Sequence, residues 1–179
     1  GTSSTHNVVI DTDSGYLYRN GGGEHGLRIY SLADPTTPTY VGSWPARYVH
    51  DAQVVTYDSG PWAGKQIAFC CGGFNGGWDE SGLCILDVTN KNNIIQLACV
   101  QHTNPNYSHQ GWLSEDRQYF YLNDELDEQN TGSLTTTRIL DVSDLQNPFQ
   151  AGTFTSGSTS IDHNLYIRGN MIFEANYTS

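Results

Sequence analysis

The stretch His109-Gln-Gly-Trp-Leu-Ser-Glu-Asp-Arg-Gln-Tyr-Phe-Tyr-Leu-Asn-Asp-Glu-Leu-Asp-Glu128 sets out a plan that the rest of the chain repeats. A histidine opens a short apolar stretch, a polar turn follows, and then come an aromatic strand over 119–122 and an acidic cluster. Weaker copies of this plan begin at His6, His50 and His163. Self-similarity of this kind is the primary indicator of a repeat architecture.

A second repeated segment follows each of the first three copies. It lies at 27–32, 83–88 and 137–142, with starts 56 and 54 residues apart. Each segment is an aliphatic or β-branched run of strand length, followed by a turn rich in Asp, Asn or Pro and by another short strand. One copy therefore reads as four strands. Four-stranded repeats of about 40–55 residues are typical of propeller blades.

The sequence thus predicts an all-β fold, a segment of a β-propeller made of four-stranded blades. We expect one region over 1–179, with three full blades at about 6–44, 50–100 and 109–155 and the first half of a fourth at 162–179. No window shows a sustained helical period. Because a closed propeller usually has about 4–8 blades, we expect a longer chain or further chains to complete the ring.

Composition limits the classes of partner. The net charge of −11 disfavours nucleic acid and anionic membrane surfaces. No stretch approaches the roughly 20 apolar residues of a membrane helix, so we expect no membrane insertion in this segment. The first five residues are small and polar and do not form a signal peptide; a mature secreted chain and an excised fragment would both look like this.

Cysteines and glycosylation sequons bear on the compartment. Cys70, Cys71, Cys84 and Cys99 all fall within the second repeat, without a Cys-x-x-Cys pair. In an exported protein we expect any disulfide to join two of these four, and in a reducing compartment all four would be buried thiols. Asn106 and Asn176 stand in Asn-x-Ser/Thr tripeptides and are candidate glycosylation sites.

The motifs quoted so far resemble those of a known family. The turns Asp-Val-Thr-Asn at 87–90 and Asp-Val-Ser-Asp at 141–144 resemble LVIVD repeats, and the run from His109 together with His50-Asp-Ala-Gln53 and Ile161-Asp-His-Asn-Leu-Tyr166 is similar to the choice-of-anchor B family of LVIVD-repeat proteins. The resemblance implies an exported β-propeller at the cell surface and carries no established activity. The Cys70-Cys71 pair and the insertion at 72–78 depart from the family's pattern.

The aligned histidines form the main candidate site. The first strand of a propeller blade lines the central channel, so equivalent residues of successive blades form a ring. The ring residues are His6, His50, His109 and His163. They suit a transition metal, with Asp51 and Asp162 as outer partners of the ring N–H groups. The other interpretation is structural: a histidine that opens a strand can hydrogen-bond the next blade and lock the ring.

The acidic run after the aromatic strand is a second candidate. Its carboxylates could bind Ca²⁺, although the spacing is not that of an EF-hand, and a solvated acidic loop is the alternative. The candidates are Asp124, Glu125, Asp127 and Glu128. The cofactor implied by either site is a divalent metal ion, a transition metal at the histidines or calcium at the acidic loop.

Motifs of common enzyme classes are missing from the sequence. It has no Gly-x-Ser-x-Gly elbow and no Walker or dinucleotide glycine motif, so no catalytic residue is assigned. We interpret the chain as a non-enzymatic extracellular or cell-surface propeller that presents an interaction surface to a protein or glycan, with a metal or small ligand at the histidines. Two alternatives stay open: a secreted metal-dependent hydrolase or oxidoreductase that uses the histidines, and a structural subunit of an extracellular assembly or filament.

Overall fold

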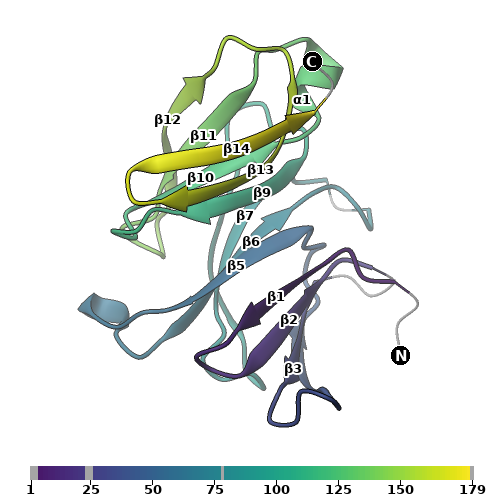
Figure 1. Cartoon of the computed structure of the whole chain (residues 1–179), viewed down its shortest axis with the longest axis vertical. Helices are drawn as coiled ribbons and strands as arrows, with labels where there is room; N and C mark the ends of the chain where they lie inside the picture. The colour runs from purple at the N-terminus through teal and green to yellow at the C-terminus, as the bar shows by residue number, and fades with distance from the viewer. Residues whose placement is uncertain (1–3, 23–25, 78, 178–179) are drawn as a thin grey trace.

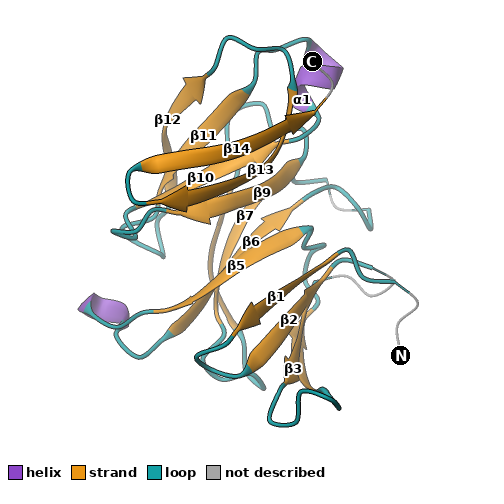
Figure 2. Cartoon of the chain, in the orientation of Figure 1, coloured by secondary structure: helices purple, strands orange, loops and turns teal. Residues whose placement is uncertain are grey.

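The computed structural model of the chain describes residues 4–22, 26–77 and 79–177. Within these ranges, antiparallel sheets follow one another in chain order, three with four strands and one with two (Figures 1 and 2). The first sheet contains β1 (Asn7–Asp11), β2 (Tyr16–Asn20), β3 (Leu27–Ser31) and β4 (Thr39–Trp44), and the second contains β5 (Asp51–Thr56), β6 (Gln66–Gly72), β7 (Gly82–Asp87) and β8 (Ile95–Val100). The third contains β9 (Ser108–Leu113), β10 (Tyr119–Asp124), β11 (Thr136–Asp141) and β12 (Phe149–Thr155), and the last contains β13 (Ile161–Arg168) and β14 (Met171–Tyr177).

The first strand of each sheet lies innermost. β1 contacts β5, β5 contacts β9, and β9 contacts β13, so these four strands form a row through the middle of the molecule (Figure 1). Each remaining strand pairs with the one before it, outward to β4, β8 and β12. This is the arrangement of propeller blades around a channel, and the predicted all-β, propeller-like class is confirmed at that level.

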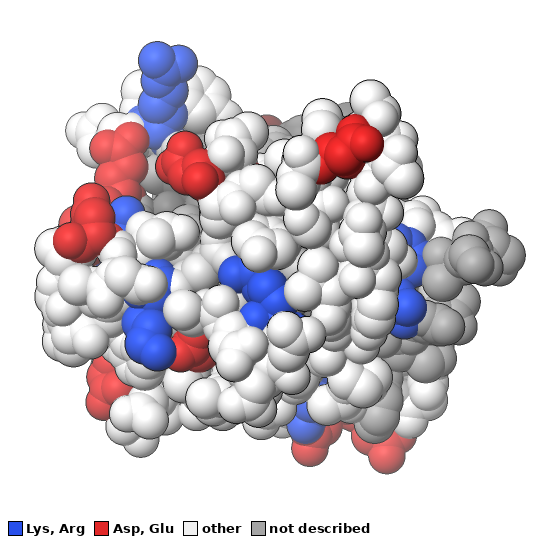
Figure 3. Space-filling view, turned by 90° about the horizontal axis from the view of Figure 1, so that it is seen from below, with Lys and Arg blue, Asp and Glu red and all other residues white. Residues whose placement is uncertain are grey.

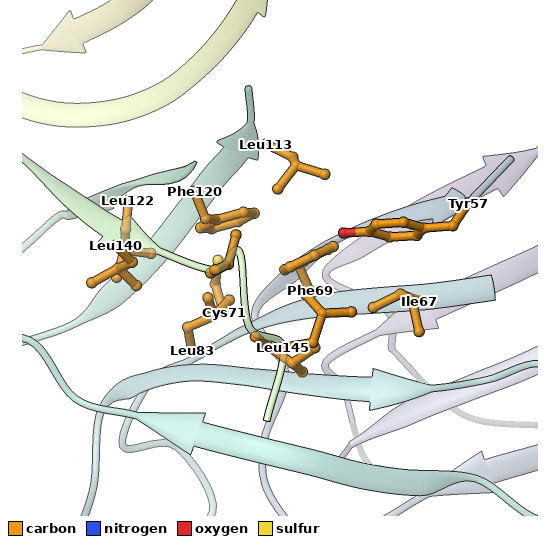
Figure 4. Close-up of a cluster of buried hydrophobic side chains, with 12 residues drawn as sticks. Tyr57, Ile67, Phe69, Cys71, Leu83, Leu113, Phe120, Leu122, Leu140 and Leu145 are labelled. Carbon is orange, nitrogen blue, oxygen red and sulfur yellow. The ribbon is translucent and has the colours of Figure 1, made fainter. Parts of the chain in front are cut away.

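The hydrophobic core lies between consecutive sheets. Phe69 of the second sheet and Phe120 of the third stack with ring centroids 5.3 Å apart, at the centre of one cluster (Figure 4). Tyr18 and Leu27 of the first sheet pack in another cluster with Leu86 of the second. Burying each of these side chains contributes on the order of 1.5–3 kcal/mol. Packing between sheets therefore holds the sheets in their relative positions.

Strand β6 of the second sheet contributes side chains to both core clusters. Side chains alternate between the two faces of a strand. Phe69 and Cys71 face the cluster shared with the third sheet, and Ala68 and Cys70 face the cluster shared with the first. A strand covered on both faces must be apolar throughout, as the sequence Gln66-Ile-Ala-Phe-Cys-Cys71 is after its first residue.

Helical structure in the described chain is short. α1 spans Asp127–Thr131, and a single 3-10 turn spans Gly60–Trp62. Gly132 ends α1 in the left-handed conformation (φ 72°), which glycine adopts without the steric penalty of a side chain. No helix among the described residues is long and apolar enough to cross a membrane.

On the face drawn in Figure 3, acidic and basic side chains are scattered among uncharged ones. The sheet of β13 and β14 instead exposes large apolar side chains, and Tyr166, Met171 and Phe173 are each half exposed or more. The last sheet therefore leaves apolar surface uncovered within this chain.

Candidate functional site

The four aligned histidines meet in a continuous stack at one end of the inner strands. His6 and His50 stand directly before β1 and β5, whereas His109 and His163 lie near the starts of β9 and β13. Consecutive ring centroids are 3.8 Å, 4.2 Å and 4.3 Å apart from His6 to His163. Histidines that are up to 157 positions apart in the sequence therefore lie in one stack in the structure. We call this group the histidine stack.

Hydrogen bonds between sheets fix the orientation of two of the rings. Nδ1 of His50 lies 3.0 Å from the backbone carbonyl of His109, and Nδ1 of His109 lies 2.9 Å from the carbonyl of His163. A carbonyl oxygen can only accept, so Nδ1 carries the proton in both rings. Each histidine thereby bonds the next sheet, as the structural interpretation of the sequence anticipated.

The same bonds leave the other ring nitrogen available. Burial, reinforced by the neighbouring histidines, lowers the pKa of His50 to about 3 and that of His109 to about 4. Both rings are therefore neutral at neutral pH, and with the proton on Nδ1 their Nε2 atoms present lone pairs. A neutral imidazole held by an Nδ1–H bond to a carbonyl is the usual form of a metal-ligating histidine. The structural and the metal-binding interpretations are thus compatible, because they use different nitrogens.

Glu125 adds a carboxylate to the stack. Its Oε2 lies 3.5 Å from Nε2 of His109, and its Oε1 lies 3.9 Å from Nε2 of His163. The hydroxyl of Tyr177 donates to Oε1 of Glu125. Since the His163 side chain is 38% exposed, this end of the stack is open to solvent.

Two overlapping sets of donor atoms lie close enough together to be candidates for holding a metal ion. One set is His6, His50 and His109, the other is His109, Glu125 and His163, and within each set the ligand atoms lie within 4.8 Å of one another. Tetrahedral zinc with bonds of about 2.0–2.1 Å places its ligands roughly 3.4 Å apart. The 3.5 Å between His109 and Glu125 already approaches that value, so small side-chain rotations would close the second set around an ion.

The expected outer partners are placed differently from the prediction. Asp51 accepts from the side chain of Asn7 and from the backbone N–H of Ala52, and no described histidine ring donates to Asp51 or Asp162. The two carbonyls of the neighbouring histidines take the role expected of these carboxylates. The sequence could not reveal this, because backbone carbonyls have no residue signature.

Polar residues beside the histidines join the sheets further. Gln110 donates to the carbonyl of Leu165 and accepts from its N–H, at 3.0 Å and 2.8 Å. The side chain of Gln53 accepts from the backbone N–H of Leu113 at 2.7 Å. These bonds satisfy backbone groups between the sheets and add direction to an otherwise apolar contact.

The four carboxylates of the acidic run, which the sequence offered as calcium ligands, separate in the structure. Asp124, which is fully buried, accepts from the backbone N–H groups of Asn106 and Tyr107 and lies 3.0 Å from Nε2 of His102. Glu125 turns to the histidine stack. The oxygens of Asp124 are thus engaged by donors from the loop before β9 and by His102.

Asp127 and Glu128 instead meet Asp162 on β13. The three side chains are at most 6% exposed, and their oxygens lie within 4.8 Å of one another. Arg138 of β11 donates to Asp127 and reaches 4.0 Å from Asp162. Burial, and then the charges of Glu128 and Asp127, raise the pKa of Asp162; burial and Asp127 raise that of Glu128.

Cysteines and sequons have the following places. Cys84 and Cys99 form a disulfide across β7 and β8, and Cys70 and Cys71 are buried free thiols. Asn106 is half-buried in the loop before β9. Asn176 is exposed on β14, but the threonine of its sequon, Thr178, lies outside the described residues.

Sequence reasoning missed the roles of three residues at this end of the molecule. The sequence pattern places Arg138 in an aliphatic strand and Glu125 in a candidate calcium loop, and it assigns no role to His102. A buried arginine in the alternation Thr-Thr-Arg-Ile-Leu was a usable signal, because a charge at that place needs a partner. For Glu125 and His102 the adjacent sequence contains no such signal.

Comparisons with known proteins identify a fold and no family. No protein-family model matches the sequence, and no curated protein matches it. Solved structures do match. A Lactobacillus plantarum protein superposes with a TM-score of 0.70 and 12% sequence identity, and the match covers 96% of this chain and 50% of that protein. A functionally unknown protein from Desulfotomaculum acetoxidans superposes with a TM-score of 0.65 and 10% sequence identity, and the match covers 98% of this chain and 50% of that protein. A provisionally assigned 6-phosphogluconolactonase from Bacteroides fragilis superposes with a TM-score of 0.60 and 9% sequence identity, and the match covers 86% of this chain and 40% of that protein. The fold is propeller-like. This chain spans about half the length of these neighbours, and identities this low show the fold alone.

Proposed function

We propose that the protein is a non-enzymatic extracellular or cell-surface β-propeller that binds a transition metal ion of the zinc class through its histidine stack. The observation that carries the proposal is the arrangement of His109, whose Nδ1–H is bonded to a neighbouring sheet while its Nε2 faces Glu125 at 3.5 Å. A purely structural histidine would need only the first of these contacts. The two-histidine, one-carboxylate set is one that zinc uses in proteins.

The proposed location rests on two separate supports. A disulfide between Cys84 and Cys99 is typical of oxidising compartments. The resemblance to LVIVD-repeat proteins of the choice-of-anchor B family implies a cell-surface protein, for which we propose a protein or glycan partner. Further blades or chains that complete the ring belong to the same proposal and are supported by the exposed apolar side chains of the last sheet.

A metal-dependent enzyme is the second candidate, and one observation favours it. The set of His109, Glu125 and His163 is open on the His163 side, and a zinc ion with three protein ligands and an open position activates a bound water. Tyr177, bonded to Glu125, would stand beside that water. A structural subunit of an extracellular assembly is the third reading and needs no ion.

Zinc titration of variants tests the metal proposal. Protein stripped with a chelator is titrated with ZnSO₄ in a calorimeter. We expect binding by the wild type and its loss in Glu125→Gln and in His109→Asn. In the second variant the asparagine Nδ2–H replaces Nδ1–H of the histidine but nothing replaces Nε2, so the bond to the next sheet is kept while the ligand is removed.

The matched control is His102→Asn. His102 is buried and hydrogen-bonded near Asp124, outside the stack, so this variant should lose stability but still bind zinc. Failure of the wild type to bind, or equal binding by wild type and His109→Asn, would contradict the proposal and leave the stack as a structural lock.

A further inference from the structure

We propose that Asp127, Glu128 and Asp162 form a second cation site, separate from the histidine stack, that binds a hard divalent ion of the calcium class. We call these residues the buried acidic cluster. Asp127 and Glu128 belong to α1, and Asp162 to β13, which α1 contacts. The donor group shares no residue with either donor group of the histidine stack.

The charges of the buried acidic cluster are not balanced by the described protein groups around it. The three carboxylates are 3%, 6% and 0% exposed. Arg138 is the cation that contacts them, and it bonds to Asp127 while staying 4.0 Å from Asp162. Glu174 nearby adds a further negative charge and accepts from Thr137. Buried charges are paired or coordinate metals, and one arginine leaves an excess of negative charge here.

Unpartnered oxygens point to the same conclusion independently of the charge count. Both carboxylate oxygens of Glu128 and both of Asp162 are buried without a hydrogen-bond partner. Most buried polar atoms in native proteins have one. One oxygen of each of these carboxylates and one of Asp127 lie within 4.8 Å of one another, so the three side chains converge on one place.

Asp124 provides a comparison inside the same segment. It is as buried as Asp162, yet it has two backbone N–H donors and His102 at its oxygens. The fold thus supplies partners for a buried carboxylate where no ligand is needed. Glu128, four residues further along the chain, and Asp162 on β13 have no such partners among the described residues, which is what a site for a bound ion would require.

The class of ion follows from the donors and from access. Carboxylate oxygens without nitrogen or sulfur are ligands for hard cations, and Ca²⁺ tolerates irregular sets of several carboxylates at about 2.3–2.6 Å, whereas Mg²⁺ keeps most of its waters. A surface hollow of about 520 Å³ reaches Asp127 and Arg138 and is otherwise lined by residues such as Asn106, Thr131 and Gln150. The hollow gives water and an ion access to the Asp127 side of the cluster, and bound waters would complete the coordination.

Ion binding at this place would hold α1 to β13. The expected result is a rise in Tm of roughly 5–10 °C when Ca²⁺ is added to chelator-treated protein at about a hundredfold excess over its Kd. Mg²⁺ at the same concentration should give a smaller rise. Equilibrium dialysis with CaCl₂ should find one bound Ca²⁺ per chain.

Two neutral variants test which residues bind the ion. Asp162→Asn and Glu128→Gln keep side-chain volume and remove the charge, so each should raise Tm in calcium-free buffer and abolish the rise with Ca²⁺. Asp124→Asn is the matched control: it should lower Tm with and without Ca²⁺ and leave the calcium response intact. Glu125→Gln should lose zinc binding and keep the calcium response, which separates this site from the histidine stack.

An unchanged Tm of the wild type with Ca²⁺, or a calcium response that persists in both Asp162→Asn and Glu128→Gln, would overturn the inference. In that event the carboxylates share protons among themselves instead of binding an ion. Because zinc binding is measured separately, the experiments can refute the calcium site without refuting the zinc site, or the reverse.

Discussion

His50 and His109 stack with ring centroids 4.2 Å apart while Nδ1–H of His50 donates to the backbone carbonyl of His109 across 3.0 Å. The same relationship repeats between His109 and His163. The histidine at the same place in the second and third repeats thus joins its sheet to the next one through Nδ1 and leaves Nε2 available for a ligand. A histidine held in this way can serve a structural and a ligand-binding role at the same time, because Nδ1 makes the bond between the sheets and Nε2 is the ligand atom.

The two roles of His109 should separate by substitution. His109→Ala leaves the carbonyl of His163 without its donor and creates a cavity, so we expect a loss of about 2–4 kcal/mol in the free energy of unfolding. His109→Asn keeps the donor and should lose less than about 1 kcal/mol. Urea unfolding in the presence of a chelator measures both. Equal losses for the two variants would show that the Nδ1 bond contributes nothing.

Acid should destabilise the metal-free protein through the stack. The folded pKa of His50 is lowered to about 3 from its usual 6.5, so the unfolded chain takes up the proton first as pH falls. The stability that depends on neutral His50 is therefore present above pH 6.5 and lost as pH falls towards the folded pKa. The measurement is the stability difference between wild type and His50→Asn from pH 7.5 to 4.5, since the difference cancels the contributions of the buried carboxylates. We expect the advantage of the wild type to shrink as pH falls; a constant difference would contradict the lowered pKa.

Reduction of the disulfide should weaken the second sheet without unfolding it. Cys84 and Cys99 are 15 residues apart, and closing a loop of that length in the unfolded chain is worth about 3 kcal/mol. The expected change is a fall in Tm of roughly 6–12 °C in reductant. Alkylation of unfolded, non-reduced protein followed by mass spectrometry should count two free thiols, Cys70 and Cys71. The same thiols should not react in the folded protein, because both are buried. Four thiols under non-reducing conditions would refute the pairing.

The exposed apolar face of the last sheet should drive association of this chain. Phe173 on β14 is 53% exposed and lies on the same face as Met171 and as Tyr166, its cross-strand partner on β13. We expect concentration-dependent association in sedimentation experiments, reduced in Phe173→Ser. Phe149→Ser is the control, since Phe149 is equally exposed (55%) on the outer strand β12, away from this face. A monomer at all concentrations, or an equal effect of both variants, would count against the prediction.

Local sequence patterns were sufficient to predict the strands of the fold and to group the four histidines. Strand periodicity and turn residues act locally, so four strands per repeat could be read from 27–32, 83–88 and 137–142 and their flanking segments. A repeat at fixed spacing also places equivalent residues at equivalent positions, which is why His6, His50, His109 and His163 could be grouped without any structure.

Tertiary structure alone decided how those groups are used. Asp124, Glu125 and Asp127 are neighbours in sequence, yet one meets His102, one meets the histidine stack and one meets Arg138. The chain turns from β10 into α1 within these residues, so successive side chains point in different directions towards partners far away in sequence. Burial and hydrogen bonding of a carboxylate depend on those distant partners. Its chemistry is therefore set by packing between sheets, which local sequence does not encode.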